Sequence, residues 1–360
     1  MKRILYIVPH RLNRSPGQRF RCEHFIPILQ KNGYEVTYSN LLTEWDDKYF
    51  YQPKRYAVKA FIFCKAFLHR CFDVLRARKF DGIFIYREAF MVGTTLFERG
   101  LAKSGKPIIF DFDDSIWITD VSEGNKNLSW MKRSSKTDEI IALSNLVIVG
   151  NQYLAEHARQ FNKNVAIIPT TIDTNYHKPT EKQAKDTICI GWTGSETTIR
   201  HFKLIIPVLK RIKEQYGDKV SFIQISNLTS ECPEIGLETI VWNAKDEIAQ
   251  LQRIDIGIMP LPDDAWAKGK CGFKGLQYMA LEIPTVMSPV GVNTEIIDNG
   301  KNGFFATTDD EWFAVLCKLI DDENLRVSIG KEGRKTVEER YSINSQKDSY
   351  LSLFENITNK

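Results

Sequence analysis

The chain has 360 residues, of which 43% are hydrophobic and 26% charged, and its formal net charge is +4. This balance is that of a folded globular protein, and the length exceeds a comfortable single core, so two domains are expected. No run approaches the ~18 consecutive apolar residues of a membrane span. The seven cysteines are scattered without a CxxC pair, which fits a reducing cytoplasm and argues against a disulfide framework or a zinc site.

Twelve short apolar runs alternate with helical patterns along the chain. The first six are residues 3–9, 35–39, 82–86, 107–111, 146–150 and 165–169, and the second six are 187–192, 220–225, 238–241, 255–260, 284–288 and 303–307. Such runs between helices are typical of parallel strands covered on both faces. The first run is too short for a signal peptide and is predicted to be a buried strand. Two sets of six predict an α/β protein with two doubly wound domains.

The break between the two sets lies at Pro169 to Asp186, a polar stretch without a long apolar run. We therefore expect an N-terminal domain over 1–170, a linker over 171–185 and a C-terminal domain over 186–339. Residues 340–360 have a helical pattern.

The first strand is followed by the loop PHRLNRSPGQRFRCEHF. Pro16 and Gly17 mark a turn in it, and Arg19 and Arg21 are expected to open the next helix. Two interpretations of this loop stay open: it is part of a binding site, or it is an exposed basic loop.

Residues 48–79 have the most unusual composition in the chain. Nine basic residues and eight aromatic residues are interleaved there with a single acid, Asp73. Basic and aromatic residues on an amphipathic helix favour contact with an anionic membrane surface. Nucleic acid would attract the same charges, but no nucleic-acid-binding signature accompanies them, so no nucleic-acid partner is expected. The alternative is a helix that packs on the core and has a solvated basic face.

The strand over 107–111 ends in the sequence DFDD. Asp111 and Asp113 match the three-letter DxD metal motif, which is weak evidence on its own. Asp113 or Asp114 can instead cap the following helix, because aspartate is a favoured N-cap.

Lys268 to Phe305 form the stretch around which the second half is organised. Leu276, Met279 and Ala280 have the spacing of a buried helical stripe. Lys270 and Lys274 lie near the start of this helix, and glycine loops lie before and after it. Amide groups at a helix start, two ammonium groups and close backbone approach at glycine make a site for phosphate.

The same stretch resembles the nucleotide-sugar signature of family 4 glycosyltransferases, which are retaining enzymes of the GT-B fold. The resemblance rests on four segments, which are 277–280 (QYMA), 283–286 (IPTV), 291–295 (GVNTE) and 302–303 (NG). Gly269 and Gln277 stand where that family has its two glutamates, so the usual carboxylate pair is lost. Gln277 can still hydrogen-bond a donor hydroxyl, without charge.

The resemblance implies two Rossmann-like domains that face each other across a cleft, with the C-terminal helix crossing back to the first domain. The first domain would then bind the acceptor and the second the donor. Asp113 or Asp114 would lie where many members have an active-site histidine, so either can orient the acceptor hydroxyl or accept its proton. The resemblance further implies donor-binding roles for the following residues, all numbered in this chain: Gly17, Arg19, Gly194, Ser195, Lys270, Lys274, Gln277 and Gly291.

The resemblance implies a metal-independent, cofactor-free glycosyltransferase that moves a sugar from a nucleoside-diphosphate sugar to a glycan or lipid-linked acceptor. The variant of the signature is similar to a subgroup associated with bacterial surface polysaccharides. We expect a cytoplasmic protein, peripheral on the inner face of the plasma membrane. Two alternatives stay open, a GT-B nucleotide-sugar epimerase and an inactive subunit that binds a partner transferase. A nicotinamide enzyme is disfavoured, because no GxGxxG follows the first strand.

Overall fold

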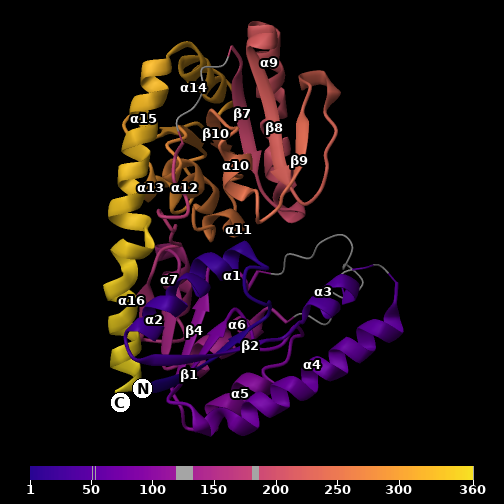
Figure 1. The fold of residues 1–360 in the computed structure, drawn as a ribbon, viewed down its shortest axis with the longest axis vertical. Coiled ribbons are helices and arrows are strands. Elements are labelled where there is room, and N and C mark those ends of the chain that lie inside the picture. The colour runs from indigo at the N-terminus through magenta and orange to yellow at the C-terminus, as the bar shows by residue number, and fades with distance from the viewer. Residues whose placement is uncertain (51, 53, 119–132, 181–185, 360) are drawn as a thin grey trace. The chain divides into compact units, whose positions relative to one another are not determined.

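The computed structural model describes residues 1–50, 52, 54–118, 133–180 and 186–359. The chain forms two compact units, Met1–Thr170 with Gln346–Lys360 and Thr171–Ser345, and both can be followed in Figure 1. Parts of three predicted segments lie outside the described residues: Tyr51 and Pro53 of the basic aromatic segment, 181–185 of the linker, and Lys360 of the terminal helix.

The first unit contains a six-stranded sheet with the order β2-β1-β3-β4-β5-β6. Its strands are β1 (Lys2–Val8), β2 (Tyr34–Asn40), β3 (Gly82–Tyr86), β4 (Ile108–Phe112), β5 (Leu146–Val149) and β6 (Val165–Ile167). All neighbouring strands are parallel, with Leu5 opposite both Thr37 and Ile83. The strand order reverses between β1 and β3. In open α/β sheets, ligands bind outside the carboxyl ends of the strands at such a reversal.

Helices cover both faces of this sheet, as parallel connections require. They are α1 (Pro16–Arg21), α2 (Ile26–Lys31), α3 (Glu44–Phe50), α4 (Tyr56–Arg76), α5 (Leu96–Ala102), α6 (Ser135–Leu143) and α7 (Gln152–Arg159). The last helix, α16 (Ile343–Thr358), contributes its part from Gln346 onward to this unit. Its Tyr350 is fully buried and stacks on Phe25 with the ring centroids 3.9 Å apart.

The second unit contains a six-stranded sheet with the order β12-β11-β10-β7-β8-β9. Its strands are β7 (Ile188–Thr193), β8 (Val220–Ser226), β9 (Glu238–Val241), β10 (Ile256–Met259), β11 (Thr285–Met287) and β12 (Phe304–Phe305). The strands are again all parallel. This is the strand order of the dinucleotide-binding fold, with the reversal between β7 and β10.

The helices of the second unit pack their apolar sides on this sheet. They are α8 (Ile199–Lys203), α9 (Ile206–Tyr216), α10 (Glu247–Leu251), α11 (Ala265–Lys268), α12 (Phe273–Ala280), α13 (Asn293–Ile296), α14 (Asp309–Asp321) and α15 (Glu323–Thr336). The main core includes Val208 and Ile212 of α9 together with Leu316 of α14, all less than 1% exposed.

The predicted α/β architecture with two sets of six parallel strands is confirmed, and each predicted apolar run overlaps one strand. Within the described part of the chain, no helix combines the length and the apolarity needed to cross a bilayer. The acceptor-binding and donor-binding roles of the two halves stay predictions.

Candidate functional site

In the second unit, the candidate site is built around the start of α12. Gly272 is the N-cap residue and has a left-handed backbone with φ of 67°. A side chain there would be strained, and an added Cβ would lie 2.2 Å from Ile296 Cδ1. With no side-chain cap at Gly272, the first-turn amides of α12 make the positive end of a helix dipole, which favours an anion. The predicted stripe is confirmed, because Leu276, Met279 and Ala280 are fully buried.

Buried contacts hold α12 against the strands β7 and β10. The Thr193 amide, the last of β7, donates a 2.7 Å hydrogen bond to Tyr278 Oη. Gly257 of β10 faces the Tyr278 ring so closely that a Cβ would lie 2.4 Å from it. These contacts place α12 over β7 and β10, the two strands between which the order reverses, and Lys274 in its first turn lies beside Trp192 near the end of β7. Ligands of such folds bind at a reversal of this kind.

Positive charge gathers around this helix start. Lys274 Nζ lies 5.7 Å from the centre of the Trp192 ring, and Lys270 Nζ lies 5.0 Å from that of Trp266. Burial lowers the pKa of the neighbouring His201 to about 4, and Lys274, Arg200 and Lys270 contribute to that lowering. His201 is therefore neutral near pH 7. Its Nδ1 has no hydrogen-bond partner among the described residues.

Gly194 and Ser195, the predicted phosphate loop, directly follow β7. A Cβ on Gly194 would lie 2.2 Å from the Trp192 ring, so packing alone requires glycine there. Ser195 is the N-cap residue of a short 3₁₀ turn, Glu196–Thr198, and forms a capping box with Thr198. The structure thus brings this loop to the same sheet edge as α12 and gives both residues a structural role.

Gln277 lies inside the unit. Its side chain is 3% exposed, and its amide lies 3.4 Å from both His177 Nε2 and Glu247 Oε1. His177 and Glu247 are themselves 0% and 2% exposed. The residue predicted to reach a donor hydroxyl therefore takes part in a buried polar cluster.

Gly291, the last predicted donor-binding residue, has a steric reason to be glycine. Its φ is +57°, and a Cβ would lie 2.6 Å from the Lys268 carbonyl oxygen. The Gly291 loop and the end of α11 therefore touch backbone to backbone.

Gly291→Ala is expected to destabilise the second unit by about 1–3 kcal/mol, because a left-handed backbone strain and a steric clash add. Gly236 offers a matched control, since its φ is +62° and nothing lies within 4 Å of an added Cβ. Denaturant unfolding of both variants isolates the clash. Equal losses would show that the Lys268 contact carries no stability.

In the first unit, the carboxyl ends of β3 and β4 bring together the predicted aspartates. Asp113 Oδ1 accepts hydrogen bonds from Tyr86 Oη at 2.9 Å and from Arg87 Nη2 at 2.7 Å. Asp114 Oδ2 accepts one from the same Arg87 nitrogen at 2.5 Å. Gly17 packs on this group, and its added Cβ would lie 2.8 Å from Tyr86 Oη and 3.2 Å from Asp113 Oδ2.

The third aspartate of this strand end forms a buried ion pair. Arg21 binds Asp111 through two hydrogen bonds, Nε to Oδ1 at 3.1 Å and Nη2 to Oδ2 at 2.8 Å. Both side chains are at most 1% exposed, and Arg21 also donates to the Ile168 carbonyl. Burial raises the pKa of Asp111 to about 6, against the opposing effect of Arg21.

The exposed-loop interpretation is wrong for Arg19 and Arg21, although residues 12–14 of the same segment are exposed. Arg19 and Arg21 are 8% and 1% exposed, and they close α1 rather than open it. Arg19 stacks on Phe20 with 4.4 Å between its guanidinium carbon and the ring centre. The hydrophobic packing of α1 draws both arginines into the unit, which composition alone does not reveal.

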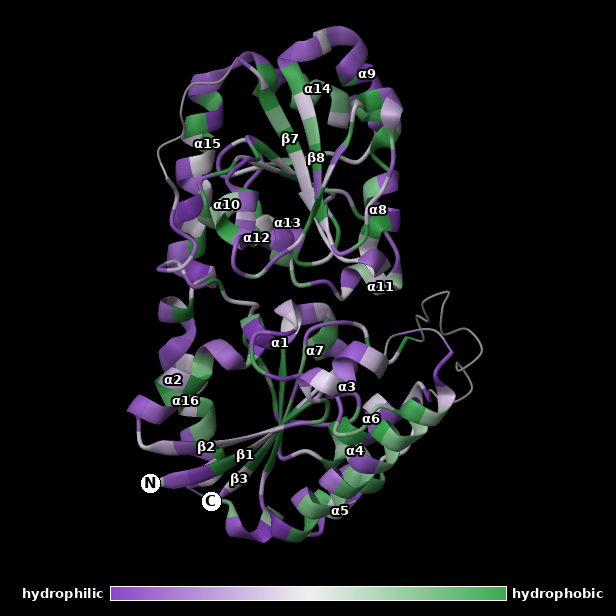
Figure 2. Cartoon of the chain, turned by 45° about the vertical axis from the view of Figure 1, so that its right-hand side comes forward, coloured by the Kyte–Doolittle hydropathy of each residue, from purple (hydrophilic) through white to green (hydrophobic). Residues whose placement is uncertain are grey.

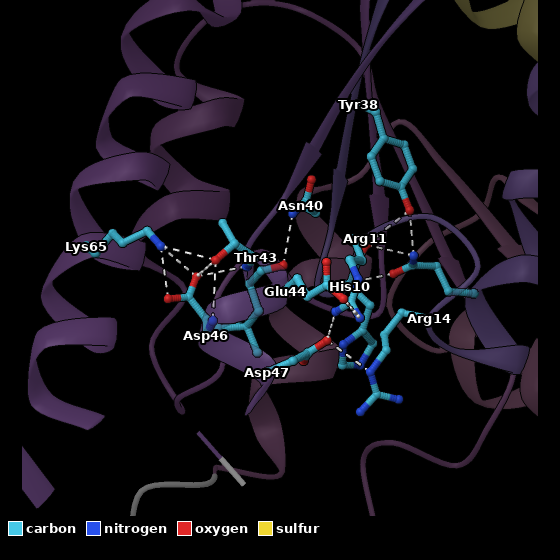
Figure 3. Close-up of polar contacts among 12 residues, drawn as sticks. His10, Arg11, Arg14, Tyr38, Asn40, Thr43, Glu44, Asp46, Asp47 and Lys65 are labelled. Carbon is cyan, nitrogen blue, oxygen red and sulfur yellow. Dashed lines mark hydrogen bonds and ion pairs between the residues drawn. The ribbon is translucent and has the colours of Figure 1, made fainter. Parts of the chain in front are cut away.

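His10, which follows β1 after Pro9, is a candidate that the sequence analysis missed. Figure 3 shows it surrounded by Arg11, Arg14 and Asp47. Gln18 fixes its backbone, accepting from the His10 amide at 3.1 Å and donating to its carbonyl at 2.8 Å. Burial lowers the pKa of His10 to about 4. The charge of Asp47 acts against this lowering, and those of Arg14, Arg87 and Arg11 add to it.

The surroundings of His10 are polar and partly open. Asp47 accepts from Arg11 and, at 2.9 Å, from Arg14 Nε. His10 Nδ1 and Asp47 Oδ1 are buried and have no hydrogen-bond partner among the described residues. An adjacent open depression of about 700 Å³ is lined by Arg11, Arg14, Glu44, Trp45, Asp47 and Lys48.

His10, Tyr86, Arg87 and His201 are the site candidates that sequence reasoning did not find. Tyr86 ends a predicted strand, and His10 and Arg87 each directly follow one. Their position at a carboxyl strand end was the signal by which the sequence could have revealed them. The φ of Arg87 is 60°, which is uncommon for a residue with a side chain and often marks a functional turn. Among the residues that the structure describes, no cluster of three or more His, Cys, Asp or Glu side chains is placed to hold a metal ion.

Comparison with known proteins gives both a family match and a fold. Residues 185–322 match the family model described as glycosyl transferases group 1. A curated relative, the capsular polysaccharide biosynthesis glycosyltransferase CapM of Staphylococcus aureus, is 24% identical over 187 residues. That match covers 48% of this chain and 46% of CapM, so the chain spans about half the length of this relative.

Two solved structures resemble the whole chain in fold. A glycosyltransferase from Rickettsia africae has a TM-score of 0.69 at 13% identity, over 99% of this chain and 98% of that one. Anabaena HepE in complex with UDP-glucose has a TM-score of 0.66 at 13% identity, over 99% of this chain and 100% of that one. The fold is GT-B, as the sequence analysis predicted.

Proposed function

We propose that this protein is a retaining GT-B glycosyltransferase that moves a sugar from a nucleoside-diphosphate sugar onto a glycan or lipid-linked acceptor. The observation that carries the proposal is the start of α12, where Lys270 and Lys274 flank a glycine cap at the strand reversal. This site lies within the segment that matches group 1 glycosyl transferases. HepE, which has the same fold, binds UDP-glucose.

The donor diphosphate would lie at the positive end of α12. Its charge would be balanced by Lys270, Lys274 and the first-turn amides, with Gly194, Ser195 and Gly291 on the neighbouring loops. These groups stabilise the negative charge that grows on the departing diphosphate, and electrostatic stabilisation of this kind commonly contributes more to catalysis than any other effect. Front-face retaining chemistry needs no protein nucleophile, so none is assigned.

The acceptor would be handled by the first unit. Asp113 and Asp114 are proposed to orient the attacking hydroxyl, with Arg87 fixing both carboxylates. Because the pKa of His10 is about 4, its imidazole is neutral at pH 7 and is suited to hydrogen bonding rather than to proton abstraction. The roles of Gly17 and Arg19 are proposed to be positioning roles, since both pack within α1.

The biological setting is also a proposal. CapM is named for capsular polysaccharide biosynthesis, which supports a role in surface polysaccharide synthesis. A lipid-linked acceptor of that kind would be presented at the inner face of the plasma membrane. We accordingly propose a cytoplasmic protein that binds this anionic surface peripherally.

One observation favours a second candidate function. Gln277 replaces a glutamate of the resembling family and is buried against Glu247 and His177. An inactive subunit that binds a donor for a partner transferase would tolerate that loss. Donor hydrolysis or transfer by the purified chain removes this candidate, and donor conversion without any acceptor would indicate an epimerase instead.

The test of donor binding is a thermal-shift panel of nucleoside diphosphates and nucleotide sugars. A ligand at about 100 times its dissociation constant adds about 2.7 kcal/mol to stability, so a true donor should raise the melting temperature clearly. No shift with any nucleotide would overturn the proposal.

The same panel, run in EDTA and with Mn²⁺, tests metal independence. Two lysines and helix amides supply the positive charge, and the carboxylates of Asp111 and Asp113 each bind an arginine. The shift is therefore expected to be equal in both buffers. A shift that needs Mn²⁺ would contradict metal independence while leaving donor binding intact.

A further inference from the structure

The helix α4 has one buried face and one face turned away from the first unit. Its buried positions are Ile62, Ala66, Arg70 and Asp73, at helical spacing. The opposite positions form what we call the outer face of α4: Tyr56, Ala57, Ala60, Phe61, Cys64, Leu68, Phe72 and Leu75. The large side chains of this face are between 56% and 80% exposed. Figure 2 shows hydrophobic ribbon along much of the visible length of α4.

No charged residue belongs to the outer face, so the alternative of a helix with a solvated basic face is wrong. Two of the helix's basic residues, Arg70 and Lys65, instead attach it to the unit, and a third, Arg76, pairs within the helix. Arg70 is buried and binds Asp73 at 2.7 Å and the carbonyls of Val8, Ser39 and Ala89. Lys65 pairs with Asp46 at 2.7 Å, and Arg76 pairs with Asp73 at 2.7 Å.

The remaining basic residues of the segment lie at the two ends of the outer face. They are Lys48, Lys54, Arg55 and Lys59 near its start, and Arg78 and Lys79 beyond its end. None of these six forms an ion pair with a residue in the described part of the chain. The first group accompanies aromatic rings, since Lys48 and Arg55 both lie over Tyr49.

The apolar surface continues from α4 onto α3. Trp45 is 48% exposed and meets Phe61 edge to face, with 6.3 Å between the ring centres. From Tyr56 to Leu75 the outer face is roughly 30 Å long at the rise of an α-helix. Monomeric soluble proteins rarely expose a continuous apolar surface of this extent without a binding role.

Charge decides between the occupants of such a surface. If two copies paired their outer faces antiparallel, Lys54 and Arg55 of one would meet Arg78 and Lys79 of the other. A parallel pair would place each basic end against its own copy. Both arrangements bring like charges together. An anionic lipid surface instead offers negative charge to the basic residues at both ends of the outer face at once. Tryptophan and tyrosine beside basic residues are also typical of the membrane interface.

We propose that the outer face of α4 inserts into the headgroup and acyl boundary of an anionic bilayer, with the basic residues at its two ends bound to lipid phosphates. The inference rests on the proposed function only in naming the membrane as the place where the acceptor is met. This mode of binding differs from a purely electrostatic contact, because the side chains of Phe61, Leu68, Phe72 and Leu75 are buried in lipid.

The experiment compares two sets of four substitutions in the full chain. The test set is Phe61→Ser, Leu68→Ser, Phe72→Ser and Leu75→Ser. The matched control is Ile167→Ser, Leu204→Ser, Leu228→Ser and Val327→Ser, which removes four other exposed apolar side chains. Cosedimentation with vesicles of phosphatidylcholine, alone or mixed with phosphatidylglycerol, measures binding. Circular dichroism checks that each variant is folded.

We expect wild type and control to bind the anionic vesicles, and the test set to bind at least tenfold more weakly. Substituting Lys54, Arg55, Arg78 and Lys79 with Gln should also weaken binding and flatten its salt dependence, because the screening length falls to about 3 Å at 1 M salt. Binding by the folded test set equal to wild type would overturn the inference. The inference would also be overturned if the wild type formed a dimer that does not bind vesicles and if the test substitutions dissociated that dimer.

The vesicle assay contains no nucleotide, so its result is independent of donor binding. A chain that binds vesicles but no nucleotide would refute the proposed transferase and leave the membrane face standing. A chain that binds nucleotide but no vesicles would refute the membrane face and leave the proposed transferase standing.

Discussion

Lys274→Gln is expected to weaken the binding of a nucleoside diphosphate by about 1.5–3 kcal/mol, the usual loss for a hydrogen bond to a charged group. This corresponds to roughly a tenfold to hundredfold rise in the dissociation constant. Glutamine keeps most of the side-chain length and removes the charge, so the change isolates the electrostatic contribution. Calorimetric titration with UDP and other nucleoside diphosphates measures the effect.

Lys210→Gln supplies the matched control for this experiment. Lys210 is on α9 of the same unit and pairs with Glu234 at 3.3 Å on the surface, so the change in net charge is the same. We expect nucleotide affinity to stay at the wild-type value in this control. If both variants bind alike, the charge at the start of α12 does not hold the donor.

The arrangement of the sheets could be predicted because its signal is local. An apolar run such as residues 146–150 becomes a strand covered on both faces, and four residues of it, Leu146–Val149, form β5. Twelve such runs in two sets are sufficient for two parallel sheets. The strand order, which sets the reversal between β7 and β10, depends on contacts far apart in the sequence and was not predicted.

The residues around the start of α12 could be singled out from the sequence, but their packing could not. The stripe of Leu276, Met279 and Ala280 indicated which side of α12 is buried, and the glycines marked the close approaches. The burial of Gln277 could not be foreseen, because its partners His177 and Glu247 come from 100 and 30 residues away. Tertiary contacts of this kind leave no local pattern.

Charge was the least reliable guide in the first unit. Arg19, Arg21 and Arg70 suggested solvated basic surfaces by composition, yet all three are buried. The charge of Arg21 is balanced by Asp111, 90 residues away in the sequence, and that of Arg70 by Asp73, 3 residues away. A buried arginine is interpreted correctly only once its partner is known.

Arg21→Met is expected to destabilise the protein by about 3–5 kcal/mol at pH 7, the usual loss when one partner of a buried ion pair is removed. The guanidinium binds both oxygens of Asp111 in a site where the two side chains are 1% and 0% exposed. Methionine keeps the apolar contacts of the stem and leaves the Asp111 carboxyl without its cation. Denaturant unfolding compared with wild type measures the loss.

The loss should depend on pH in a defined direction. The pKa of Asp111 is already raised by burial to about 6, and removing Arg21 raises it further. An unfolded aspartate has a pKa of about 3.9, so the folded state holds the proton more tightly. Its stability therefore falls as pH rises from about 4 through the folded pKa. The difference between Arg21→Met and wild type should accordingly be largest at pH 7 and should shrink towards pH 4.

Arg99→Met separates this effect from the loss of any arginine. Arg99 pairs with Glu139 at 2.9 Å, but its side chain is 61% exposed. Surface pairs contribute at most about 1 kcal/mol, so we expect a small change that differs little between pH 4 and pH 7. A loss in Arg21→Met no greater than in Arg99→Met, or one that is the same at both pH values, would mean that Asp111 is not held ionised by Arg21. In that case the carboxyl would already be protonated in the native state.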